Sequence, residues 1–164
     1  MKTKTRLLIC DDHPLVRAGI KATLAAERTL EIVAEASNGR EAVSETRRVR
    51  PDLVLMDISM PELNGLEAIS QIKEFDKDIK VLIMTMYDDE EVVIRCLTAG
   101  ASGYILKDAP LPQLIYAIGM VVKGNEYLDP GVTRNVNEYV QQSRPRQMSY
   151  DRLSPREREV LKLV

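Results

Sequence analysis

Five short apolar runs recur along the chain, and each is followed by a segment with helical spacing. The runs are residues 6–10, 31–36, 53–56, 81–85 and 103–106. A short apolar run bounded by turn residues is typical of a strand buried on both faces of a parallel sheet. This alternation predicts a doubly wound α/β domain, with a five-stranded, mostly parallel sheet joined by right-handed crossovers.

The segments between the runs carry helix signals. Pro14 suits the first turn of a helix, and Gly65 to about Phe75 places apolar residues three positions apart. Acidic residues 88–91 favour the start of a further helix that stops at Gly100. The clearest amphipathic stripe begins at Leu111. We therefore expect helices between successive strands and after the last one.

Polar side chains gather where the predicted strands end. Asp11 and Asp12 follow the first run, Asp57 follows the third, Thr85 closes the fourth, and Lys107 follows the fifth. In a parallel sheet every strand points its carboxyl end to the same edge, where ligands of such sheets bind. The element pattern thus places three carboxylates, one hydroxyl and one ammonium together.

That combination restricts the chemistry. Carboxylates that lie close together repel one another and resist ionisation unless a cation compensates them. Mg²⁺ takes carboxylate oxygens, keeps several waters and accepts a phosphate oxygen as a further ligand. An aspartate can also attack phosphorus and form an aspartyl phosphate, a transfer that depends mainly on positioning and charge neutralisation. A magnesium-dependent phosphoryl site is therefore expected at this edge.

Composition sets wider limits. With 164 residues, 45% apolar and 29% charged, the chain resembles an ordinary soluble protein with one main domain. Cys10 and Cys96 lie in apolar runs and match no metal or disulfide spacing, so reduced, buried thiols are expected. No stretch is long enough for a transmembrane helix or a signal-peptide core, which favours a cytoplasmic protein.

The last part of the chain differs from the rest. Residues 134–164 hold seven basic and four acidic residues, whereas the remainder is acidic. Residues 130–142 could form a helix, and residues 143–147 have linker composition. Ser154 and Glu157 then form a capping box around Pro155, so a new helix is predicted to begin there. We expect it to open a second domain that continues beyond Val164.

The site motifs resemble those of two-component response regulators, in particular the subfamily in which a receiver domain is joined to a LuxR-type (NarL/FixJ-like) helix-turn-helix. The matching residues are Asp11-Asp12, Met56-Asp57-Ile58-Ser59-Met60-Pro61 with Asn64-Gly65, Met84-Thr85, Ala99-Gly100-Ala101 and Tyr104-Ile105-Leu106-Lys107. The resemblance implies a flavodoxin-like sheet of order 2-1-3-4-5. It divides the chain into a receiver (5–124), a linker with a helix (125–150) and the truncated start of the helix-turn-helix domain (151–164).

The resemblance also implies roles. Asp57 would be the phosphoacceptor. Asp11, Asp12 and Asp57 would hold Mg²⁺ together with the backbone carbonyl of Ser59. Switch residues would be Lys107, which pairs with the phosphoryl oxygens, Thr85, whose hydroxyl moves onto one of them, and Tyr104, which reorients into the vacated space.

Partners follow from the same resemblance. A sensor histidine kinase would donate the phosphoryl group, phosphorylation would favour a homodimer, and the full-length output domain would bind DNA. Sequence-specific DNA binding is not expected of these 164 residues alone. The chain would be no enzyme beyond accepting, and slowly losing, its own phosphoryl group.

Each assignment has an alternative. Asp11 and Asp12 could be helix caps, Lys107 a solvated charge, and Tyr104 ordinary packing. An aspartyl-phosphate phosphatase would need a second aspartate two residues after the nucleophile, where this chain has Ser59. A receiver that acts only through a protein partner also stays open, because one helix of the output domain is visible.

Overall fold

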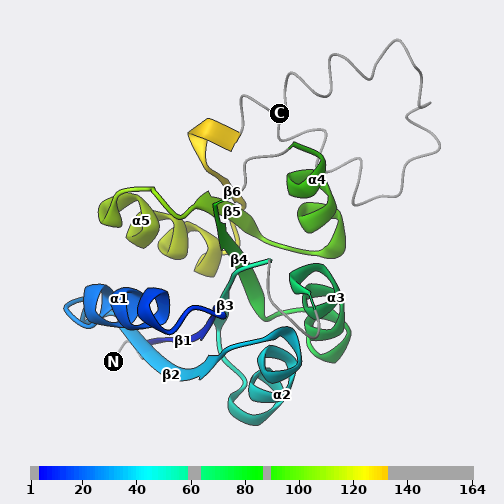
Figure 1. Ribbon diagram of the computed structural model, residues 1–164, viewed down its shortest axis with the longest axis horizontal. Helices are drawn as coiled ribbons and strands as arrows, with labels where there is room; N and C mark the ends of the chain where they lie inside the picture. The colour runs from blue at the N-terminus through cyan, green and yellow to red at the C-terminus, as the bar shows by residue number, and fades with distance from the viewer. Residues whose placement is uncertain (1–3, 59–63, 87–89, 133–164) are drawn as a thin grey trace.

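The structure is a computed structural model that describes residues 4–58, 64–86 and 90–132 (Figure 1). Its sheet is parallel throughout and has the order β2-β1-β3-β4-β5-β6. The strands are β1 (Thr5–Cys10), β2 (Leu30–Ala36), β3 (Leu53–Met56), β4 (Lys80–Thr85), β5 (Gly103–Leu106) and β6 (Tyr127–Leu128). The predicted fold class and the order 2-1-3-4-5 are confirmed, but the sheet has a sixth strand that the sequence did not reveal.

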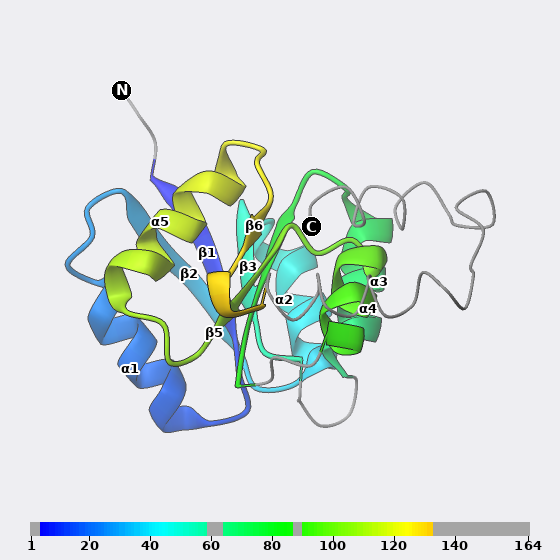
Figure 2. The same ribbon diagram turned by 90° about the horizontal axis from the view of Figure 1, so that it is seen from above.

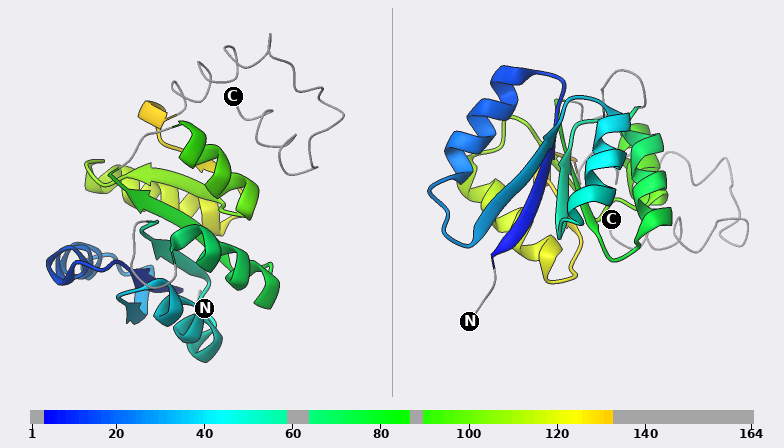
Figure 3. Two further views of the ribbon diagram at one scale, coloured as in Figure 1. Left: turned by 45° about the vertical axis from the view of Figure 1, so that its right-hand side comes forward. Right: turned by 90° about the horizontal axis from the view of Figure 1, so that it is seen from below.

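Helices cover both faces of this sheet. They are α1 (Pro14–Leu24), α2 (Gly39–Val49), α3 (Gly65–Phe75), α4 (Glu90–Ala99) and α5 (Leu111–Val122). Figures 1 and 2 show α1 and α5 on one face and α2, α3 and α4 on the other. The same three layers are visible in both views of Figure 3. The crossovers therefore use both faces of the sheet, as in a doubly wound fold.

Strand β6 pairs with β5, so that Leu128 lies opposite Tyr104. The two residues of β6 belong to the range 125–150 that was expected to be a linker. Residues 130–132, which follow β6 after Asp129, are helical. The remainder of the helix expected over 130–142, the linker at 143–147 and the helix-turn-helix start at 151–164 lie outside the described residues.

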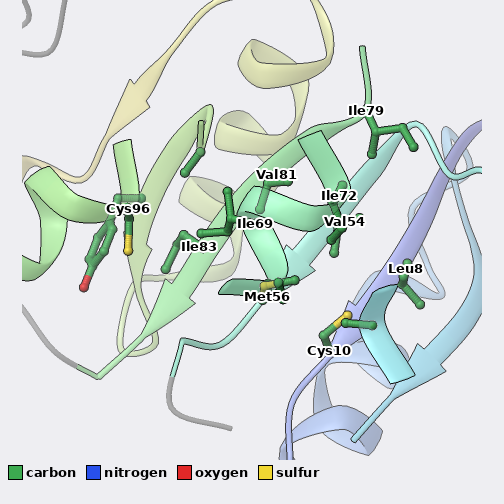
Figure 4. Packing of buried hydrophobic residues seen from close by; sticks show 14 of the residues in the cluster. Leu8, Cys10, Val54, Met56, Ile69, Ile72, Ile79, Val81, Ile83 and Cys96 are labelled. Atoms are coloured by element: carbon green, nitrogen blue, oxygen red, sulfur yellow. The ribbon is translucent and has the colours of Figure 1, made fainter. Parts of the chain in front are cut away.

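The core is divided in two by the sheet, because successive strand residues point to opposite faces. In β3, Val54 and Met56 pack toward α2, α3 and α4, whereas Leu53 and Leu55 pack toward α1 and α5. Figure 4 shows the first of these cores, where Ile69 and Ile72 of α3 lie over the strands. All four β3 side chains are at most 2% exposed. Burial on both faces explains why β3 reads as an unbroken apolar run.

Both cysteines are buried free thiols, as predicted. Burial raises the pKa of Cys96 to about 12 and that of Cys10 well above its usual range. Neither thiol is therefore available as a thiolate at neutral pH.

The loop after β3 passes very close to the start of α3. Gly65 donates its backbone N–H to the carbonyl oxygen of Ile58 at 3.0 Å. A Cβ atom at position 65 would lie 2.5 Å from Cα of Ile58 and 2.9 Å from the carbonyl oxygen of Asp57. Because both neighbours are backbone atoms, a side chain here would displace the loop that carries Asp57.

We expect Gly65→Ala to lower the free energy of unfolding by about 1–3 kcal/mol through this overlap. Gly119→Ala is the matched control, because a Cβ atom there would meet nothing within 4 Å and the residue lies in α5. Its greater helix propensity should raise stability by up to about 1 kcal/mol. Urea unfolding midpoints at unchanged slope measure both effects. Equal midpoints for the two variants would contradict the close approach.

Candidate functional site

Strands β1 and β3 bring two of the predicted carboxylates side by side. Cys10 pairs with Met56 at the ends of these strands, and the N–H of Asp57 donates to the carbonyl oxygen of Cys10 at 2.9 Å. The next residue of each strand therefore stands at the same level of the sheet edge. Asp11 is 2% exposed and Asp57 is 5% exposed.

Lys107 reaches this pair from the end of β5. Its Nζ donates to Oδ2 of Asp11 at 2.6 Å and to Oδ2 of Asp57 at 3.1 Å. The backbone N–H of Lys107 donates to the carbonyl oxygen of Thr85 at 2.8 Å, which fixes the start of the lysine side chain beside β4. Only 12% of that side chain is exposed, so Lys107 is not a solvated charge.

Charges in the site stabilise one another. Burial opposes ionisation of Asp11, but hydrogen bonds from Lys107 and His13 outweigh it and lower the pKa of the carboxyl group. Burial likewise opposes the charged form of Lys107, yet hydrogen bonds to Asp11 and Asp57 raise the pKa of its ammonium group. At neutral pH the site therefore holds the charged ammonium group of Lys107 beside the ionised carboxylate of Asp11.

Asp12 offers the third carboxylate. Ligand atoms of Asp11, Asp12, His13 and Asp57 all lie within 4.8 Å of one another. Oδ1 of Asp12 is buried, and no group in the described part of the chain donates a hydrogen bond to it. His13 Nδ1 lies 2.9 Å away in an ion-pair contact that is not a hydrogen bond. A buried carboxylate oxygen without a donor, beside two further carboxylates, fits a hard divalent cation such as Mg²⁺.

Two of the other predicted residues, Thr85 and Tyr104, lie on strands β4 and β5. Thr85 ends β4, pairs with Leu106 and is fully buried. Tyr104 is also fully buried and belongs to the core under α4, so its ring already occupies an inward position. Ser59 lies outside the described residues. The helix-cap alternative for the two aspartates is wrong for α1, because His13 is its N-cap and no side chain caps it.

Three contacts at the site were not anticipated. His13 donates its backbone N–H to Oδ1 of Asp11 at 2.8 Å. Arg17 donates to the carbonyl oxygen of Asp11 at 2.5 Å. Asp129, 6% exposed, accepts from the N–H of Leu106, the residue before Lys107, at 3.2 Å. The DDHP stretch could have drawn attention to His13. The contact of Arg17 with Asp11 spans six residues and that of Asp129 with Leu106 spans 23, and no spacing rule indicates either.

A parallel sheet of order 2-1-3-4-5 that carries an acidic cluster and a lysine at its carboxyl edge defines a receiver-type α/β domain. Residues 7–119 match the response regulator receiver domain family, and the chain belongs to that family. The family is not one of catalytic enzymes, which removes support from the phosphatase alternative.

Several proteins of this family are similar to the chain over most of its length. The chain is 42% identical to the oxygen regulatory protein NreC of Staphylococcus epidermidis, over 97% of this chain and 76% of NreC. It is also 42% identical to the transcriptional regulatory protein DegU of Brevibacillus brevis, over 84% of this chain and 59% of DegU. A crystal structure of a LuxR-family two-component response regulator from an Aurantimonas species superposes with a TM-score of 0.81 at 31% identity, covering 85% of this chain and 99% of that one.

Within the described residues, no helix combines the length and apolar character needed to cross a membrane.

Lys107→Met tests the charge arrangement without added metal. The variant leaves Asp11 and Asp57 without their shared ammonium donor, so the free energy of unfolding at pH 7 should fall by about 1.5–3 kcal/mol. The lowered pKa of Asp11 contributes stability above the ordinary aspartate pKa of 3.8, and this contribution is lost as the pH falls through the lower folded value.

The deficit of the variant should accordingly shrink below about pH 4, as followed by urea unfolding across pH. Lys123→Met, at an exposed lysine after α5, is the control and should behave like the wild type. A deficit that stays constant with pH would show that Lys107 stabilises the fold by packing alone.

Proposed function

We propose that this protein is a response regulator that accepts a phosphoryl group on Asp57 from a sensor histidine kinase. The observation that carries the proposal is the shared hydrogen bonding of Lys107 to Asp11 and Asp57, beside a third carboxylate. Such an arrangement suits a small anion that arrives together with a divalent cation.

The acceptor step uses the carboxylate of Asp57. One of its oxygens attacks phosphorus, the bond from phosphorus to the donor nitrogen breaks, and the donor imidazole keeps that electron pair. The product is a mixed anhydride at the mouth of the sheet edge. Asp11, Asp12, Asp57 and the Ser59 carbonyl would hold Mg²⁺, which when bound neutralises charge on the phosphoryl oxygens.

Lys107 would then exchange partners. Its ammonium now bonds to Asp57, and after transfer it would pair with a phosphoryl oxygen of the same residue. The raised pKa of Lys107 supports this role, because the ammonium stays charged throughout. Thr85, at the end of β4, would donate its hydroxyl to a second phosphoryl oxygen. The ring of Tyr104 would occupy its buried position in the core under α4.

Output would follow from a shift between two conformations. The phosphoryl group on Asp57, which carries about two negative charges, would favour the arrangement in which Thr85 and Lys107 close on it. Inverting a 1:99 population takes about 5.5 kcal/mol of differential interaction. We propose that the favoured state dimerises and controls a DNA-binding output. The relative DegU is named a transcriptional regulatory protein, which supports an output in transcription.

Intact mass spectrometry tests the acceptor. After incubation with a small phosphodonor and Mg²⁺, the wild type should gain the mass of one phosphoryl group. Asp57→Asn should gain none, because an amide is not a nucleophile toward phosphorus. Asp108→Asn, at the exposed acid next to Lys107, should be modified like the wild type. An adduct that persists in Asp57→Asn would refute the assignment.

The switch role of Thr85 is separable from acceptance. Thr85→Val keeps the shape and removes the hydroxyl, so the adduct should still form while any phosphorylation-dependent dimer is weakened roughly tenfold, the value of one charge-assisted hydrogen bond. Thr85→Ser keeps the hydroxyl and should retain dimerisation. Light scattering of phosphorylated samples across a concentration series provides the measurement. A Thr85→Val protein that dimerises like the wild type would exclude the hydroxyl as a switch.

A further inference from the structure

Arg17 lies one turn into α1 and points back to the acidic edge. Its guanidinium donates to the carbonyl oxygen of Asp11 at 2.5 Å, and its Nε donates to Oε1 of Glu35 on β2 at 3.3 Å. The side chain is only 18% exposed although it belongs to a helix at the surface. Arg17 therefore joins the loop after β1 to the neighbouring strand.

Glu35 is itself fixed. Lys21, one turn further along α1, donates to its second carboxylate oxygen at 2.8 Å. This hydrogen bond is the largest contribution that lowers the pKa of Glu35, so the carboxylate is ionised at neutral pH and retains its attraction for Arg17. Arg17 and Lys21 thus each bind one oxygen of the Glu35 carboxylate, and this carboxylate anchors the Arg17 side chain.

The contact falls on the peptide that joins two predicted cation ligands. A peptide unit is planar, so holding the carbonyl of Asp11 also fixes the direction in which the chain enters Asp12. The N–H of Asp11 donates to the carbonyl oxygen of Ala36 at 3.0 Å, and its side chain is held by His13 and Lys107. In contrast, Oδ1 of Asp12 has no hydrogen-bond donor among the described residues. Apart from the ion-pair contact with His13 Nδ1 at 2.9 Å, the placement of Asp12 therefore depends on the backbone before it.

We propose that Arg17 is a positioning residue for the divalent cation: by holding the Asp11 carbonyl it directs the carboxylate of Asp12 toward those of Asp11 and Asp57. The inference rests on the proposed function and adds to it a residue outside the predicted ligand set. Groups that orient metal ligands commonly change metal affinity by about 10- to 100-fold when they are removed.

Electrostatics alone predicts the opposite change in Mg²⁺ affinity when Arg17 is removed. Removing a guanidinium from the neighbourhood of three carboxylates makes the site more negative, which favours a divalent cation. Weaker cation binding in a variant without Arg17 would therefore report lost positioning, and tighter binding would report lost repulsion. The direction of the change decides between the two.

The test measures Mg²⁺ binding without a phosphodonor. Thermal unfolding of the whole chain is followed across a MgCl₂ titration, and the Mg²⁺-dependent rise of Tm gives an affinity for each variant relative to its own metal-free Tm. For Arg17→Ala we expect the rise to need about tenfold more Mg²⁺ than for the wild type. Arg17→Lys keeps the charge and one donor, so it should recover part of the affinity.

Arg48→Ala is the matched control, because Arg48 pairs with Glu45 within α2 and forms no hydrogen bond or ion pair with Asp11, Asp12, Asp57 or Lys107. It should titrate like the wild type. An Arg17→Ala protein that binds Mg²⁺ as tightly as the wild type, or more tightly, overturns the inference. A wild type whose Tm does not respond to Mg²⁺ while Asp57 is still phosphorylated overturns the proposed metal site as well, so the two failures are distinguishable.

Discussion

The hydrogen bonds from Lys107 to Asp11 and Asp57 are the interaction on which the carboxyl edge of this sheet depends. Two carboxylates that are at most 5% exposed lie close together there, and each would resist ionisation without a nearby cation. The ammonium comes from a different strand, 50 residues beyond Asp57 in the chain. The site therefore exists only when β1, β3 and β5 are correctly placed in one sheet.

That placement is determined by the two cores beneath the edge. Because Val54 and Met56 face one layer of helices and Leu53 and Leu55 face the other, a slip of β3 by one residue would exchange the two sets. Both faces are tightly packed, so the alternation fixes the level at which Asp57 emerges beside Asp11. Hydrophobic burial below the edge thus determines distances within the polar site above it.

The predictable features are those that depend on local pattern. Five strands and the helices between them follow from apolar runs and helical spacing, and the common direction of parallel strands brings Asp11, Asp57 and Lys107 to one edge. Strand β6 has only two residues, too few to show a period, so it could not be recognised. The contacts of Arg17 and Asp129 join segments that are distant in sequence, and no spacing rule indicates them.

Stability does not explain why these charges are buried. Replacing a buried ion pair by apolar residues of similar volume is often neutral or stabilising by about 1–4 kcal/mol, because desolvation opposes the attraction. The buried oxygen of Asp12 increases this cost, since no described group donates to it. A chain under selection for stability alone would place leucine or methionine at such an edge. The acidic cluster is therefore better explained by what it can bind, and the cores on either side of the sheet supply the stability that allows it.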